Sequence, residues 1–403
     1  MFRQSGNIIL SEGEVFEKPE ISGNLYLRGG RISESVTSLA VKGGVSVEQD
    51  TSIPGNLVCL RLSSRADLSI AGDLTVEDTI TMQKGNLAVN GAIRAVTLDS
   101  SYSVRAGSVN CEKIIAGNDL IVQREIHGRT VSVGDDLRAG EIKCDEILTG
   151  SLEVGKIDCV SVRVGATASI ESGKTDSLNV EGTLESSGYM EASVMTIEKN
   201  AIFNKVKCGV MNVGGSAVSR NSMEVEELKT GESLECNDIN AGEIVVAGSI
   251  KSSGNVTASG DIRANDLITV KGEISCSTLE GTGEISAERI ECKMNIECQT
   301  KLSVIKGAIA NVIMLGRDCK VSGPIYAKQV TLSNGASAQD IYAVILHMKT
   351  GSSAANVYAD EITMWKNSTI RGRCLYRHWV RDAVGMKIDD VGEKVASLPK
   401  FPS

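Results

Sequence analysis

Aliphatic residues recur at a nearly constant step along most of this chain. In two regions the aliphatic positions advance by five to seven residues at a time. The two series are Ile244, Ile250, Val256, Ile262, Leu267, Ile274, Leu279, Ile285, Ile290, Ile296 and Leu302, and Leu68, Leu74, Ile80, Leu87, Ile93 and Leu98. Three steps take about 17 to 18 residues, and a period of this length is typical of a stacked repeat fold.

Each step has the same internal order. The aliphatic residue is followed by a polar one and then by a small one, as in residues 256–258 (VTA) and 262–264 (IRA). This alternation predicts a short strand with one buried face. The strand ends at Gly, Asn, Asp or Ser, which tolerate tight bends. Three strands and three bends return the chain to its starting angle one layer further on. The pattern therefore predicts an all-β, single-stranded, three-sided β-solenoid of roughly 20 coils.

The repeat pattern sets the expected organisation of the chain. It runs from about residue 21 to about residue 373, and we expect one solenoid over this range. Residues 1–20 are expected to form an N-terminal tail or cap, and residues 374–403 a C-terminal amphipathic cap and tail. Residues 199–227 are less regular, which predicts a loop there.

The eleven cysteines fit the same pattern. They contain no CxxC pair of the kind that zinc and redox sites use, and nine follow an aliphatic residue by two positions. Residues i and i+2 of a strand point to the same face, so these thiols are expected in the core as small hydrophobes. The predicted core thiols include Cys111, Cys144, Cys159, Cys276, Cys292 and Cys298. Many free thiols are typical of a reducing compartment.

Charge and hydropathy narrow the function classes. The formal net charge is −9, and no basic stripe with interleaved aromatics is present, so a nucleic-acid partner is disfavoured. No apolar stretch reaches the roughly 20 residues that span a bilayer, and the N-terminus does not resemble a secretory signal. We therefore expect a cytoplasmic protein.

Aromatic residues make up only 3% of the chain, and they gather toward the C-terminus. The open end of a solenoid exposes unpaired backbone groups that must be covered or matched to another chain. The C-terminal aromatics could serve either as a cap or as an assembly contact. The candidate residues are Tyr358, Trp365, Tyr376 and Trp379.

Catalytic and cofactor motifs are missing from the sequence. It has three histidines and lacks phosphate-binding loops, nucleophile elbows and HExxH pairs. We expect no enzymatic activity, no metal and no cofactor. Two alternatives stay open: a β-helical fibre or adhesin outside the cell, and a hexapeptide-like acyltransferase, for which only His127 lies within the repeats.

Repeats such as GSIKSSGNVTASGDIRA and AGDLTVEDTITMQKGNLAVNGAIRA resemble those of the bactofilins, polymer-forming cytoskeletal β-helix proteins. The resemblance implies a right-handed coil and a filament-forming or scaffolding role. It also implies self-association, with the membrane surface or cell-shape proteins as further partners. Met1, Phe2 and Arg3 loosely match the start of that family, which implies contact with a membrane.

Overall fold

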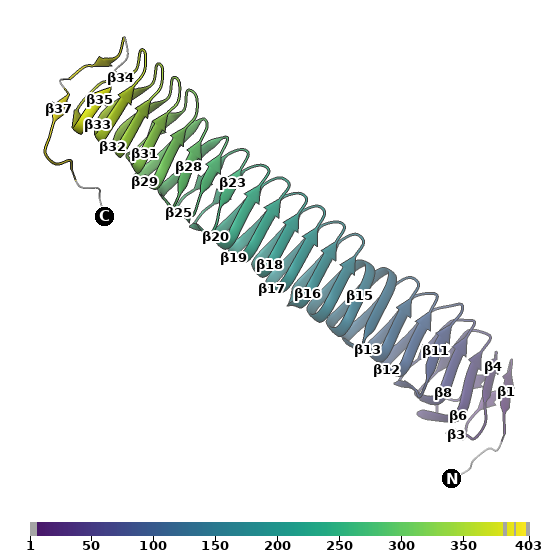
Figure 1. Cartoon of the computed structure of the whole chain (residues 1–403). Coiled ribbons are helices and arrows are strands. Elements are labelled where there is room, and N and C mark those ends of the chain that lie inside the picture. The colour runs from purple at the N-terminus through teal and green to yellow at the C-terminus, as the bar shows by residue number, and fades with distance from the viewer. Residues whose placement is uncertain (1–5, 382–384, 391, 400–403) are drawn as a thin grey trace. The chain divides into compact units, whose positions relative to one another are not determined.

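The protein is described by a computed structural model that covers residues 6–381, 385–390 and 392–399. Within these ranges it consists of strands, turns and bends, with no helix. The chain divides into two compact units, residues 1–198 and residues 199–403. In each unit the strands lie side by side in successive turns (Figure 1).

The strands of the first unit range from two-residue segments to long strands that continue around the corners of the coil. They are β1 (Ile8–Ser11), β2 (Val15–Phe16), β3 (Glu20–Ile21), β4 (Leu25–Arg28), β5 (Arg31–Ile32), β6 (Ser38–Val47), β7 (Thr51–Ile53), β8 (Asn56–Ser64), β9 (Leu68–Ile70), β10 (Leu74–Val76), β11 (Thr79–Met82), β12 (Leu87–Ser100), β13 (Val104–Ala116), β14 (Leu120–His127), β15 (Thr130–Val164), β16 (Ala168–Val180) and β17 (Leu184–Ile197).

The strands of the second unit are of the same kinds. They are β18 (Ala201–Val213), β19 (Ala217–Thr230), β20 (Leu234–Val246), β21 (Ile250–Ser252), β22 (Val256–Ala258), β23 (Ile262–Ala264), β24 (Ile268–Val270), β25 (Glu273–Cys276), β26 (Leu279–Gly281), β27 (Glu284–Cys292), β28 (Asn295–Cys298), β29 (Lys301–Leu315), β30 (Lys320–Ser322), β31 (Ile325–Leu332), β32 (Ser337–Met348), β33 (Ser353–Met364), β34 (Thr369–Ile370), β35 (Cys374–Arg381), β36 (Lys387–Ile388) and β37 (Glu393–Lys394).

Each coil contributes strand segments to three parallel ladders. In the second unit, β20 pairs through its three parts with β21, β22 and β23, and all three pairings are parallel. In the first unit, β8 pairs in the same way with β10 and β11, while β7 pairs with β9. The single-stranded, three-sided β-solenoid predicted from the sequence is thereby confirmed. It has about 23 turns, slightly more than the roughly 20 predicted.

The coils begin earlier and end later than the repeat pattern indicated. β1 pairs in parallel with β4, and β37 pairs with β35, so ladder pairing starts at Ile8 and reaches Lys394. The loop predicted in residues 199–227 is wrong. β18 and β19 pair there from Ala201 to Val213, with one register irregularity between Phe203 and Val206, and Phe203 fills the core where its partner on β19 is the smaller Ser219.

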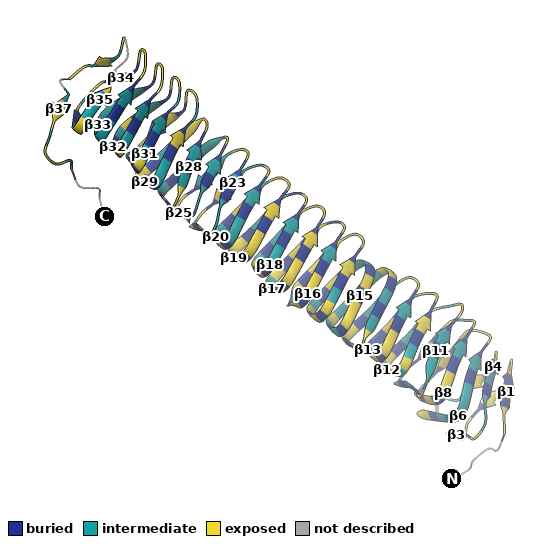
Figure 2. Ribbon diagram, viewed as in Figure 1, coloured by how far each residue is buried: buried dark blue, intermediate teal, exposed yellow. Residues whose placement is uncertain are grey.

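Burial alternates along each strand, as Figure 2 shows by colour. In β22, Val256 and Ala258 are buried and Thr257 faces outward. One predicted core position is wrong: Leu267 is only half-buried, and its neighbour Ile268 takes the inward position at the start of β24. Coil length varies, since Leu152 pairs with Ala168, sixteen residues on, whereas Leu25 pairs with Val45, twenty residues on.

The glycines of the repeat lie where successive coils approach most closely. At several corners of the coil, an Asn or Asp side chain accepts a hydrogen bond from a backbone N–H one coil later, and a glycine comes just before that N–H. A Cβ on this glycine would collide with the Asn or Asp oxygen. The acceptor–glycine pairs are Asn24–Gly43, Asn56–Gly72, Asp73–Gly91, Asn200–Gly215, Asp238–Gly254, Asn255–Gly272 and Asn356–Gly372.

Candidate assembly surfaces

The N-terminal end of the first unit is the outer edge of β1. This strand pairs with β4, and no other described strand pairs with it along its length. Ile9 and Val15 are large apolar residues of the first coil and are 53% and 57% exposed. Residues 6–21 carry four glutamates against one lysine. This end therefore combines a free strand edge, exposed aliphatic side chains and an excess of negative charge.

The C-terminal end of the second unit is formed by β36 and β37. β36 pairs with β34 and β37 with β35, and no described strand pairs with their outer edges. The described residues between 371 and 399 contain six arginines or lysines against three acidic residues. All six of these cationic side chains are exposed. The charge of this end is opposite to that of the first coil.

A ladder of tyrosines runs along one outer face near this end. Tyr326, Tyr342 and Tyr358 pair in register on β31, β32 and β33, and their rings are stacked with centroids 4.8 and 4.6 Å apart. Burial raises the pKa of Tyr326 and Tyr342 above the ordinary value of 10.0. The next position after Tyr358 in this register is Leu375 on β35, whose side chain is buried.

The four aromatic residues singled out from the sequence do not form one cluster. Tyr358 belongs to the tyrosine ladder. Trp365 lies edge-on to the His347 ring, with centroids 6.0 Å apart, and is 40% exposed. In the last coil, Tyr376 is half-buried in register with Ala359, and the Trp379 ring lies 4.8 Å from the guanidinium of Arg381. Met1, Phe2 and Arg3, the candidate membrane contacts, lie outside the described residues.

All eleven cysteines are buried and none forms a disulfide. In each unit we call one of the three ladders the cysteine ladder: it contains Leu57–Cys59 in the first unit and Val206–Cys208 in the second. The six predicted core thiols are at most 8% exposed. Five of them, Cys111, Cys144, Cys159, Cys276 and Cys292, lie on the cysteine ladders, whereas Cys298 ends β28 on another face.

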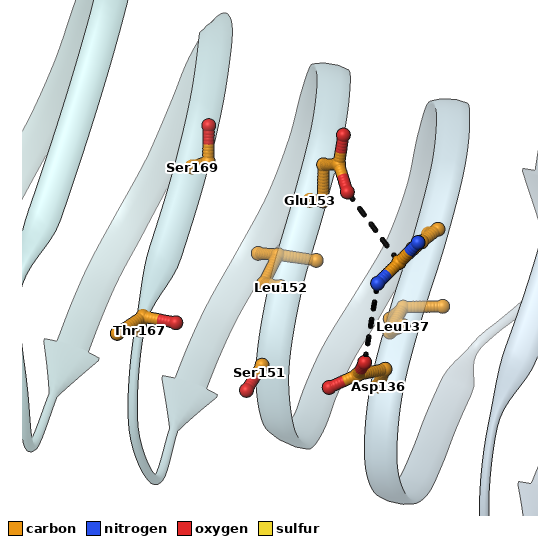
Figure 3. Close-up of a pocket in the computed structure, with 8 residues that line it drawn as sticks. Asp136, Leu137, Ser151, Leu152, Glu153, Thr167 and Ser169 are labelled. Carbon is orange, nitrogen blue, oxygen red and sulfur yellow. Dashed lines mark hydrogen bonds and ion pairs between the residues drawn. The ribbon is translucent and has the colours of Figure 1, made fainter.

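Two depressions lie over described residues of the first unit. One, of about 360 Å³, lies over residues 136–138, 151–153, Thr167 and Ser169. Figure 3 shows Asp136 and Glu153 directed at a single guanidinium. It belongs to Arg138, whose Nη2 lies 3.4 Å from Oδ2 of Asp136 and whose Nε lies 3.4 Å from Oε2 of Glu153. Both carboxylates are thus engaged by a cation. A wider groove of about 1110 Å³ lies beside the first coils and is lined by Glu12, Arg31 and Asp50 among others.

Three further observations concern possible chemistry. His127 lies on the outer side of β14, where its Nε2 is 3.1 Å from Oε2 of Glu125. Within the described ranges, no three His, Cys, Asp or Glu side chains are grouped so as to hold a metal ion. The described part of the chain also contains no long apolar helix of the kind that crosses a lipid bilayer.

The fold places this chain among the three-sided β-solenoids, a class of stacked repeat proteins. Comparison with known proteins adds no finer assignment. No family model matches the sequence, and neither the curated proteins nor the solved structures compared with it give a match.

Proposed function

We propose that this protein is a non-enzymatic structural protein of the cytoplasm that self-assembles through the two ends of its coils. The observation that carries the proposal is the pair of open ends, each a free parallel strand edge and of opposite charge. A second copy is the partner that fits both ends. The bactofilin resemblance supports this role, and it adds the membrane surface and cell-shape proteins as further partners.

The geometry of a solenoid favours joining unlike ends. All ladders are parallel, so stacking the last coil of one copy on the first coil of another continues each ladder in the same direction. Exposed N–H and C=O groups at both edges gain hydrogen bonds in such a joint. The excess of glutamate at one end and of arginine and lysine at the other attracts these ends and disfavours contacts between like ends.

Negative-stain microscopy of the purified full chain tests the proposal. Filaments are expected at low ionic strength, and they should shorten as salt rises, because screening weakens the attraction between exposed charges. Monodisperse particles at every salt and protein concentration would overturn the proposal.

Charge reversal at each end separates this assembly from nonspecific association. Glu12→Lys with Glu14→Lys should abolish filaments, and so should Lys387→Glu with Lys394→Glu, because each variant then carries two ends of like charge. An equimolar mixture of the two variants should restore filaments, since each reversed end now matches an end of the other variant. Lys229→Glu, which changes an exposed face far along the chain from both termini, is the control and should leave assembly intact. Filaments from either double variant alone would contradict the proposed joint.

A further inference from the structure

Two thiols of the first unit lie one above the other on its cysteine ladder. Cys144 and Cys159 both belong to β15 and occupy successive coils, and their Sγ atoms are 3.4 Å apart. Backbones of neighbouring strands are about 4.8 Å apart, a separation within the Cα range that a disulfide can bridge. The two sulfurs are therefore placed to form a covalent bond without rearrangement of the coils.

The environment of this pair gives solvent a route to it. His127 pairs with Lys143, so the next position along the cysteine ladder before Cys144 is Gly128, which has no side chain. A depression of about 430 Å³ is lined by Gly128, Cys144, Cys159 and Val160, with two lysines and three aspartates around it. Cys144 and Cys159 are 8% and 7% exposed.

A second pair in the same register offers a comparison. Cys276 and Cys292 are direct partners on the cysteine ladder of the second unit, with their Sγ atoms 3.3 Å apart. These two residues are only 2% and 4% exposed. The two pairs thus share sulfur geometry and differ in access, which makes the second pair an internal control.

We propose that Cys144 and Cys159 are a peroxide-reactive dithiol that closes reversibly to a disulfide between two coils. Hydrogen peroxide suits the site because it is small and uncharged, whereas an anionic oxidant would meet a rim of three aspartates and two lysines, which is negative overall. This inference does not depend on the proposed assembly.

The reaction balances with peroxide as the sole oxidant. Cys159 releases its thiol proton, the thiolate attacks one peroxide oxygen and the O–O bond breaks, and the departing hydroxide takes up the proton that Cys159 released and leaves as water. The Cys144 sulfur then attacks Sγ of the Cys159 sulfenic acid, an S–S bond forms, and the S–O bond breaks to give a second water. Two electrons pass from the thiols to peroxide. A hydrogen bond from the Cys144 thiol lowers the pKa of Cys159, which favours Cys159 as the first nucleophile.

Peptide mapping of the full chain after timed exposure to hydrogen peroxide tests the proposal. A cross-linked peptide that joins Cys144 to Cys159, lighter by two hydrogen atoms and restored by dithiothreitol, should form at least about tenfold faster than the Cys276–Cys292 cross-link. In Cys144→Ser the Cys159 sulfenic acid has no partner thiol and should be trapped by dimedone. Circular dichroism of this variant should match the parent protein.

Three results would overturn the proposal. The first is oxidation of Cys144 and Cys159 no faster than that of Cys276 and Cys292. The second is rapid oxidation to sulfinic acid without the cross-link. The third is a Cys144→Ser variant in which Cys159 resists dimedone after peroxide treatment. None of these results bears on filament formation, which is measured separately.

Discussion

Asn56 and Asp73 occupy the same corner on consecutive coils, and Oδ1 of Asn56 accepts a hydrogen bond of 2.7 Å from the backbone N–H of Asp73. Asp73 repeats the arrangement one coil later, where its Oδ1 accepts 2.8 Å from the N–H of Ala92. Each side chain satisfies a backbone donor at a bend, where the regular ladder does not supply an acceptor. The bend therefore depends on a residue of the preceding coil.

Gly72→Ala should destabilise the first unit, because the new Cβ would collide with the Asn56 side chain and nearby backbone. Overpacking of this kind costs about 1 to 3 kcal/mol. Gly165→Ala is the matched control, since its nearest neighbour would lie at 3.8 Å, an ordinary contact. Urea unfolding measures both. Equal midpoints for the two variants would show that the close approach at Gly72 does not limit stability.

Asp73→Asn should change how stability depends on pH. The hydrogen bond from Ala92 holds the pKa of Asp73 below its usual 3.8, so its ionised form favours the folded state. That stability is fully present above pH 3.8 and is lost as pH falls through the lower, folded-state value. Asparagine keeps the acceptor oxygen but does not ionise. The variant should therefore be less stable than the parent near pH 6, and the difference should vanish in acid. Parallel unfolding curves from pH 2 to 7 would contradict this account.

Tyr342 is the middle ring of the tyrosine ladder, so its truncation removes two stacked contacts. Cross-strand aromatic pairs contribute roughly 0.2 to 1 kcal/mol each, and Tyr342→Ala should lower the unfolding free energy by about 1 kcal/mol. Tyr342→Phe keeps the ring and should retain most of that stability. Chemical denaturation followed by near-ultraviolet circular dichroism reports both changes. A Phe variant as unstable as the Ala variant would assign the effect to the hydroxyl instead.

Arg263 joins three carboxylates on one outer face of the second unit. Its guanidinium nitrogens lie 2.9 Å from Glu243, 2.6 Å from Asp261 and 3.2 Å from Glu280. Arg263→Gln leaves these negative charges together and should cost about 1 kcal/mol at low salt, with the loss falling as salt rises.

Lys229→Gln is the control for Arg263→Gln, since Lys229 forms a single contact of 4.0 Å with Glu227. Denaturation of both variants across a salt series measures the difference. A loss at Arg263 that is independent of salt would rule out charge repulsion as its cause.

The sequence predicted the coil because its two signals, alternation within strands and a step near six, are local. Both signals persist when the spacing changes slightly, so the error of placing Leu267 in the core did not change the predicted fold. Residues 199–227 misled the prediction because Phe203 stands where its ladder partner is the small Ser219 and Met211 where its partner is Leu228, although both are buried in a regular coil. Larger side chains at core positions changed the hydrophobic repeat in the sequence, but the parallel pairing of the strands was kept.

Contacts between coils were harder to predict, because they need the register of each coil. Tyr326, Tyr342 and Tyr358 are spaced by 16 residues, and that spacing could have revealed the ladder had the local coil length been known. Cys144 and Cys159 are only 15 residues apart, whereas the average period is longer. A fixed period would therefore not have aligned their sulfurs. The charge of the two ends likewise became meaningful only once the first and last coils were located.

The corner hydrogen bonds run in one direction along the chain. In all seven Asn and Asp acceptor–glycine pairs, the accepting side chain comes earlier in sequence than the N–H it satisfies. During synthesis on the ribosome, the Asn and Asp acceptors of one coil are therefore made before the backbone N–H groups of the next coil. Translation supplies the turns in the order in which they can dock, so the nascent polypeptide can fold by accretion from its first turn onward.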